Sequence, residues 1–88
     1  MYAKTYSVID LLANASTEYV TSTGLGRLLG TSTRQILRYI KEAQEYSGEY
    51  GYEILSFKGR GYQLKITDEE AYQKFVNEYG ESQAQLPE

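Results

Sequence analysis

Glycine, rather than proline, divides this 88-residue chain into segments. The only proline is Pro87, whereas eight glycines lie between residues 24 and 80. Glycine accepts the left-handed backbone conformation that ends helices and closes tight turns. The glycine spacing therefore predicts short helices and a hairpin that are joined by tight turns.

The composition limits the chain to one small domain and excludes several kinds of functional site. With 41% apolar residues, a chain of this size buries ~60–65% of its extended surface, which is enough for one thin core. Cysteine and histidine are absent. Their absence excludes thiolate and imidazole metal ligands, a cysteine nucleophile, a serine–histidine pair and disulfides. We therefore expect no enzymatic activity, no metal and no cofactor.

The hydropathy of the sequence gives an expectation about its location. No apolar stretch has the length of a membrane span, and the first residues lack the basic start and the apolar block of a secretion signal. A chain without cysteine also suits a reducing compartment. We expect a cytoplasmic protein that has no membrane partner.

The charges are segregated along the sequence. The net charge is −3, but residues 1–67 carry a net charge of +2 and residues 68–88 a net charge of −5. Residues 19–41 contain four cations and no carboxylate. Charges act on an approaching phosphate over a Debye length of ~8–10 Å, so the local potential matters more than the sum. The negative net charge therefore does not exclude a nucleic-acid partner.

Three helices are predicted in the first half of the chain. The first covers about residues 4–15, where apolar side chains form one broad face. The second ends before Gly30. The third begins with a capping box, in which Ser32 is the N-cap and Gln35 is the N3 residue, and it runs to about residue 45. Two helices joined by a three-residue turn that contains glycine are typical of a helix-turn-helix.

The second of these helices should form only by docking on a core. Either Thr21 or Ser22 can cap it. Gly24 and Gly26 each cost the helix roughly 0.8–1 kcal/mol relative to Ala. Gly26, which has no Cβ, also allows a neighbouring helix to approach closely. The side chains expected to dock the helix are Leu25, Leu28 and Leu29.

A β-hairpin with a basic tip is predicted next. Its strands cover about residues 53–57 and 62–66, and alternation of apolar and polar side chains marks the second strand. The connection, residues 58–61, places Lys58 and Arg60 beside two glycines. A further short β-prone segment lies at residues 19–21, before the second helix.

A last helix is predicted to follow a capping box at residues 67–70. Its apolar side chains recur at helical spacing, and they are Tyr72, Phe75, Val76 and Tyr79. We expect residues 1–67 to form the main domain, residues 68–80 to form a helix that is a dimer contact or a connector, and residues 81–88 to form a disordered tail.

The third helix is predicted to have one buried and one basic face. At ~100° per residue, the apolar positions Ile36, Ile40 and Ala43 fall within a stripe of ~60°. Three cations lie ~140–200° from Ile36 on the opposite side, and they are Arg34, Arg38 and Lys41. A helix that reads DNA needs such an arrangement, with one side anchored and the other carrying donors for guanine edges and phosphates.

The order of the elements predicts an α+β fold of the winged helix-turn-helix type. A three-helix bundle is followed by a β-hairpin wing, with an additional C-terminal helix. We expect Thr33 and Gln35 to read bases or bind phosphate, Leu37 to touch a thymine methyl or to pack sideways, and the hairpin tip to hold the DNA backbone or the minor groove. The candidate DNA-binding residues are Arg27, Ser32, Thr33, Arg34, Gln35, Leu37, Arg38, Lys41, Lys58 and Arg60.

The chain resembles a family of bacterial transcription regulators. The pattern Ser32-x-Arg34-x-Ile36 with Ile40, and the run from Gly59 to Tyr62, are similar to the N-terminal winged helix of BglG-like regulators of the mannitol and lichenan type, to which Mga-like regulators are related. A weaker similarity is to the DNA-binding domain of the biotin repressor. The resemblance covers about residues 5–67. It implies binding of operator or promoter DNA, and it implies longer parent chains with regulatory domains, so this chain is either an excised domain or a small regulator.

The chain departs from that family at several positions. Thr31 stands where valine is usual, Gly26 where alanine is usual and Ala43 where leucine is usual, and these departures imply a thinner core. Tyr39 replaces a frequent aspartate. Gln35 stands where threonine is common, so the base preference of the family does not carry over.

We expect the chain to act as a homodimer on double-stranded DNA, and one alternative stays open. A winged helix can also serve protein–protein assembly without DNA. The acidic C-terminal segment favours that function, and so does the loop that contains Tyr46, Tyr50 and Tyr52. Most other tyrosines fall on predicted core faces, where they fill space and leave the hydroxyl wet.

Overall fold

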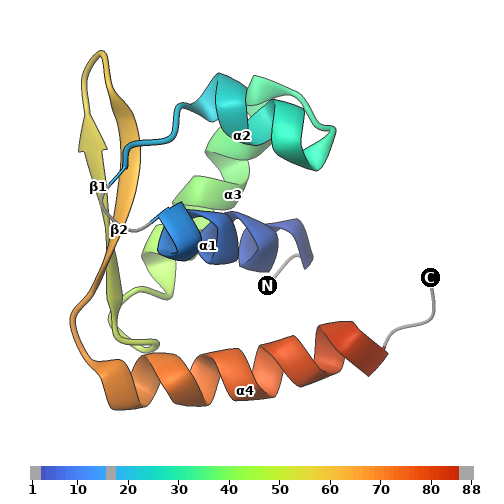
Figure 1. Cartoon of the computed structure of the whole chain (residues 1–88), viewed down its shortest axis with the longest axis vertical. Coiled ribbons are helices and arrows are strands. Elements are labelled where there is room, and N and C mark those ends of the chain that lie inside the picture. Colours follow the sequence, from blue (N-terminus) through green and yellow to red (C-terminus); the bar gives the residue numbers. More distant parts are fainter. Residues whose placement is uncertain (1–2, 16–17, 86–88) are drawn as a thin grey trace.

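The structure is a computed structural model that describes residues 3–15 and 18–85, with side chains up to residue 79. The described residues form four helices and one antiparallel hairpin, an α+β arrangement compatible with a winged-helix layout. The helices are α1 (Ala3–Ala15), α2 (Ser22–Leu29), α3 (Thr33–Glu45) and α4 (Glu69–Gln85), and the strands are β1 (Tyr52–Phe57) and β2 (Gly61–Ile66). The hairpin stands beside the first three helices, and α4 passes beneath them (Figure 1).

The caps predicted for α2 and α3 are confirmed. The Thr21 hydroxyl accepts a hydrogen bond from the Gly24 N–H at 2.9 Å, and the Ser32 hydroxyl accepts one from the Gln35 N–H at 3.2 Å. Gly30 ends α2 with φ of 66°, in the left-handed region that favours glycine. The turn between the two helices is therefore determined by local chemistry.

Gly26 allows the turn to lie against α2. A Cβ at this position would come within 2.7 Å of the Thr31 carbonyl oxygen. The Thr31 N–H donates to the Gly26 carbonyl at 2.9 Å, so the same two residues are joined by a backbone hydrogen bond. The close approach predicted at Gly26 is thus made by the turn after α2.

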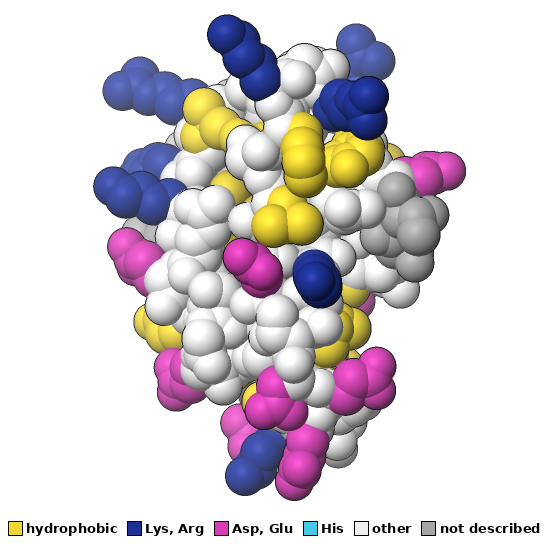
Figure 2. All heavy atoms as spheres, turned by 90° about the vertical axis from the view of Figure 1, so that its left-hand side faces the viewer, with side chains coloured by type: hydrophobic (Ala, Val, Ile, Leu, Met, Phe, Trp, Pro, Cys, Tyr) yellow, Lys and Arg dark blue, Asp and Glu magenta, His cyan; other side chains and the backbone are white. Residues whose placement is uncertain are grey.

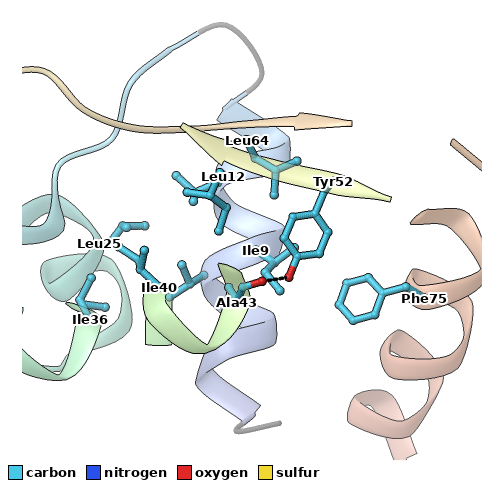
Figure 3. Packing of buried hydrophobic residues seen from close by; sticks show 11 residues of the cluster. Ile9, Leu12, Leu25, Ile36, Ile40, Ala43, Tyr52, Leu64 and Phe75 are labelled. Atoms are coloured by element: carbon cyan, nitrogen blue, oxygen red, sulfur yellow. Dashed lines mark hydrogen bonds between the residues drawn. The ribbon is translucent and has the colours of Figure 1, made fainter. Parts of the chain in front are cut away.

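The core is built from one side of each helix and from one face of the hairpin. Figure 3 shows how these side chains converge. The buried cluster contains Val8, Ile9, Leu12, Leu25, Ile36, Ile40, Ala43, Tyr52, Ile54, Leu64 and Phe75.

The prediction that Leu28 docks α2 on the core is wrong, because Leu28 is 66% exposed. Leu25 and Gly26 are buried and Leu29 is partly buried. At ~100° per residue, Leu28 lies ~110° from the centre of the face that these three form. A helix of eight residues buries only one side, so Leu28 faces outward.

The hairpin is one residue longer at each predicted strand start and has a shorter tip. Phe57 pairs with Gly61, so the tip is the three residues 58–60 and not four. The β-prone segment before α2 forms a bridge between Val20 and Tyr62, with N–H···O distances of 2.9 Å and 2.8 Å. Gly61, with φ of 117°, permits this contact, since a Cβ there would lie 2.5 Å from the Val20 carbonyl oxygen.

An aromatic layer attaches α4 to the rest of the molecule. Phe75, which is 1% exposed, lies 4.4 Å from Tyr50 and 5.5 Å from Tyr6 between ring centroids. The Tyr52 hydroxyl donates to the Ala43 carbonyl in α3 (Figure 3). Tyr52 is 2% exposed and therefore not part of a free partner surface, whereas Tyr50 is only partly buried against the core.

The start and the end of α4 differ from the prediction. Asp68, and not Thr67, caps the helix, since its carboxylate accepts from the Ala71 N–H at 3.2 Å. The helix runs to Gln85, five residues beyond the predicted end at residue 80. The only proline, Pro87, lies beyond the end of this helix at Gln85 and does not interrupt it. Residues 86–88 of the expected tail lie outside the described residues.

Among the described helices, none combines the length and the apolar character that a membrane crossing requires.

We predict that Gly26→Ala destabilises the domain. Alanine normally stabilises a helix by roughly 0.8–1 kcal/mol over glycine. Here the added methyl would press on the Thr31 backbone at 2.7 Å, so we expect a loss of about 1–3 kcal/mol in the free energy of unfolding. Urea unfolding measures it, with Gly48→Ala as control because an added Cβ there meets nothing within 4 Å. A Gly26→Ala protein as stable as the wild type would contradict the packing described.

We predict that Tyr72 makes stability fall at high pH. Burial, with smaller contributions from Asp10 and Tyr6, raises the pKa of Tyr72 to about 12, against 10.0 for an unperturbed tyrosine. Its contribution is therefore fully present below pH ~10 and is lost as the pH rises through ~12. Between those values the free energy of unfolding should fall less steeply with pH in Tyr72→Phe than in the wild type. The two slopes should differ by at most about 1.4 kcal/mol per pH unit. Parallel curves of unfolding free energy against pH for the wild type and Tyr72→Phe would refute this contribution of Tyr72.

Candidate nucleic-acid interface

The outward side of α3 presents the three cations predicted to share one face. Ile36, Ile40 and Ala43 are 0%, 3% and 0% exposed, so the opposite side of the helix is fully anchored. The side chains exposed to solvent on the outward side are Arg34, Arg38 and Lys41. The guanidinium and ammonium groups are therefore available to a ligand.

Both ends of α3 are held in place. Ser32 caps the first turn, and the backbone N–H of Tyr46 closes the last turn on the carbonyls of Ala43 and Gln44. The Tyr52 hydroxyl adds a side-chain contact to the Ala43 carbonyl. These contacts, together with the buried stripe, fix which side of α3 faces the core. The cations lie on the opposite side of the helix and therefore face outward.

The outward face of α3 is basic in its first turns and mixed in its last. Arg38 and Lys41 border a shallow depression of about 300 Å³ together with Glu42 and Glu45. On the helical wheel Glu45 falls at ~180° from Ile36, on the same side as the cations. All charged residues in the first half of α3 are therefore cations, whereas the second half also carries carboxylates.

The uncharged candidates lie around the start of the same helix. Ser32, Thr33 and Gln35 are exposed, and the Ser32 oxygen already accepts the capping hydrogen bond. Leu37 is 46% exposed, so it is not buried by sideways packing and stays at the edge of the cationic face. Arg27 is exposed in the last turn of α2. All candidates on α2 and α3 thus remain accessible.

The tip of the hairpin forms a second basic point next to the start of α2. Lys58 and Arg60 are exposed, on either side of Gly59 with φ of 81°. They line a depression of about 370 Å³ that is also bordered by Thr21 and Ser22. The structure therefore brings the hairpin tip and the beginning of α2 to one surface, although they are some 40 residues apart in the sequence.

Two aromatic residues beside the tip were not among the predicted site residues. The rings of Tyr19 and Phe57 meet edge to face with centroids 4.9 Å apart, and the Arg60 guanidinium lies over the Tyr19 ring at 5.9 Å. Phe57 is 40% exposed. The sequence marked residues 19–21 only as β-prone, and no local pattern places Tyr19 beside residues that follow it by about 40 positions.

Positive and negative side chains gather at opposite ends of the molecule. On the face with the hairpin, Lys and Arg surround one end, and Asp and Glu surround the end formed by α4 (Figure 2). At the acidic end an open groove of about 470 Å³ has Tyr50 and Phe75 in its lining. The charged residues of this groove are Glu49, Asp68, Glu70, Lys74 and Glu78.

Comparison with protein-family models, curated proteins and solved structures gave no match for this chain. The resemblance to BglG-like regulators therefore stays a prediction. The functional proposal is based on the geometry of α3 and of the hairpin.

Proposed function

We propose that this chain is a DNA-binding domain of the winged helix-turn-helix type, with α3 as the recognition helix and the β1–β2 hairpin as the wing. The observation that carries the proposal is the outward cationic face of α3, opposite a stripe of fully buried apolar side chains. The basic hairpin tip on the surface next to α2 supports it. Double-stranded DNA is the ligand that such an arrangement fits best.

The dimensions of α3 suit the major groove. Its 13 residues give a length of ~20 Å, and a B-DNA major groove of ~12 Å width admits one helix. Arg34 and Arg38 lie one turn apart on the exposed side. When such a helix lies in the major groove, its arginines reach guanine edges or the phosphates that border the groove.

The hairpin is the second contact in this proposal. Lys58 and Arg60 stand at a tip of three residues, where long cationic side chains reach the flanking phosphates or the minor groove. The depression between the tip and Thr21 has room for a backbone segment to lie against both.

Charge segregation makes binding compatible with the net charge of −3. The molecule measures 33 Å along its longest axis, whereas the Debye length is ~8 Å at physiological ionic strength. DNA at the basic end is therefore screened from the carboxylates of α4. The same asymmetry favours encounters in which the basic end approaches DNA first.

One observation favours a second function, a module for protein–protein assembly. The acidic groove along α4 has aromatic side chains in its lining, and none of its lining residues belongs to α3. Of the loop tyrosines that also favour this function, Tyr52 is buried in the core, whereas Tyr50 lines this groove. Homodimerisation stays a prediction, and so do the further regulatory domains that the family resemblance implies.

We predict that the double variant Arg34→Ala/Arg38→Ala binds a short mixed-sequence DNA duplex at least about 10-fold more weakly than the wild type. The plot of log K against log salt, taken from ~50 to ~200 mM, should flatten by about one unit for each phosphate that the variant no longer neutralises. Fluorescence anisotropy with labelled duplex measures both quantities.

The matched control is Lys65→Ala/Lys74→Ala, which removes the same formal charge from β2 and α4. Lys65 stands opposite Glu53 in the hairpin register, and Lys74 lies at the acidic groove. Equal losses of affinity for both doubles would show that only net charge matters and that the assigned face is wrong. A wild-type protein that fails to bind DNA at low salt but forms a stable complex with a protein would favour the second function.

A further inference from the structure

Tyr19 touches the hairpin tip from outside the hairpin. Its ring meets Phe57 edge to face, with centroids 4.9 Å apart and planes at 71°, and the Arg60 guanidinium lies 5.9 Å from its centroid. Tyr19 is partly buried, whereas Arg60 is exposed. An aromatic ring at this distance attracts a guanidinium through its negative face.

The backbone on the C-terminal side of Tyr19 is fixed. Val20 exchanges two hydrogen bonds with Tyr62 of β2, and Thr21 caps α2 through its hydroxyl. Gly61 allows the Val20 backbone to approach β2 closely, as any Cβ there would clash with the Val20 carbonyl oxygen. The segment that carries Tyr19 is therefore tied to the hairpin and to α2 at the same time.

Arg60 has no comparable support from its own loop. It sits in a tip of three residues, where its N–H donates to the Phe57 carbonyl at 3.0 Å and its side chain is exposed. A free arginine side chain loses rotamer freedom when it engages a phosphate, which weakens the contact. A ring that already restricts the guanidinium reduces that loss before the ligand arrives.

We propose that Tyr19 is a positioning residue for Arg60, and that it holds the guanidinium at the angle at which the wing meets DNA bound on α3. This inference rests on the proposed DNA-binding function and adds a residue to it. Tyr19 acts through Arg60 and not by stacking on a base, because its ring is already engaged by Phe57 and Arg60. The segment around Tyr19 thereby couples the wing to the helix-turn-helix.

A double-mutant cycle with matched rings tests the inference. Tyr19→Leu removes the aromatic face and Tyr19→Phe keeps it, and each is measured with Arg60 and with Arg60→Ala. For a short mixed-sequence duplex at low salt, we expect Tyr19→Leu to weaken binding about 2- to 5-fold when Arg60 is present. Tyr19→Phe should bind as the wild type does. With Arg60→Ala, Tyr19→Leu should bring no further loss of affinity.

A second readout without DNA separates contact from function. Protons held over an aromatic ring resonate upfield, so the side-chain NMR signals of Arg60 should move downfield in Tyr19→Leu and stay in place in Tyr19→Phe. A purely structural role for Tyr19 would weaken binding equally with Arg60 and with Arg60→Ala. That result, or full affinity in Tyr19→Leu, would overturn the positioning role.

The experiments distinguish a failure of the DNA-binding function from a failure of the positioning role of Tyr19. If the wild type binds no duplex at low salt while the Arg60 signals depend on the Tyr19 ring, the DNA-binding function is overturned and with it the role of the contact. If the wild type binds DNA but the Arg60 signals do not respond to Tyr19→Leu, the positioning inference alone is overturned.

Discussion

The burial of one apolar stripe on α3 is the interaction on which the rest of the structure depends. Ile36, Ile40 and Ala43 are almost completely removed from solvent, and each buried isoleucine contributes on the order of 1.5–3 kcal/mol. Because an α-helix is rigid about its axis, burial of one side determines what the other side presents. The outward direction of Arg34 and Arg38 is thus a consequence of core packing, with no dedicated contact needed to hold them.

The second constraint is the bridge between Val20 and Tyr62, which fixes the hairpin relative to the helices. Its two hydrogen bonds join β2 to the segment that leads directly into α2. A hairpin at the end of a flexible loop would place its tip anywhere on a wide arc. Here the tip lies on the same surface as the start of α2, and the acidic helix α4 lies at the other end of the molecule (Figures 1 and 2). The bridge therefore fixes the basic hairpin tip beside the start of α2, the helix that precedes α3.

Local chemistry in the sequence predicted most of the helices and the orientation of α3, because caps, glycine turns and helical spacing act within a few residues. It did not predict contacts that depend on three-dimensional neighbours. Tyr19 meets Arg60 only once β2 has paired with Val20. Leu28 is exposed, contrary to the prediction, because a helix of eight residues buries one side only. The predicted end of α4 is too early, since the helix continues through Gly80 to Gln85.

The most direct test of the central claim is to map the backbone amide signals of the labelled protein by NMR while a short DNA duplex is added at low salt. If α3 and the wing bind the duplex, the largest shift changes will fall on the first half of α3 and on the tip around Lys58 and Arg60, and the amides of α4 will stay unchanged. Changes concentrated along α4 and its acidic groove, or none anywhere on α3, would contradict the claim.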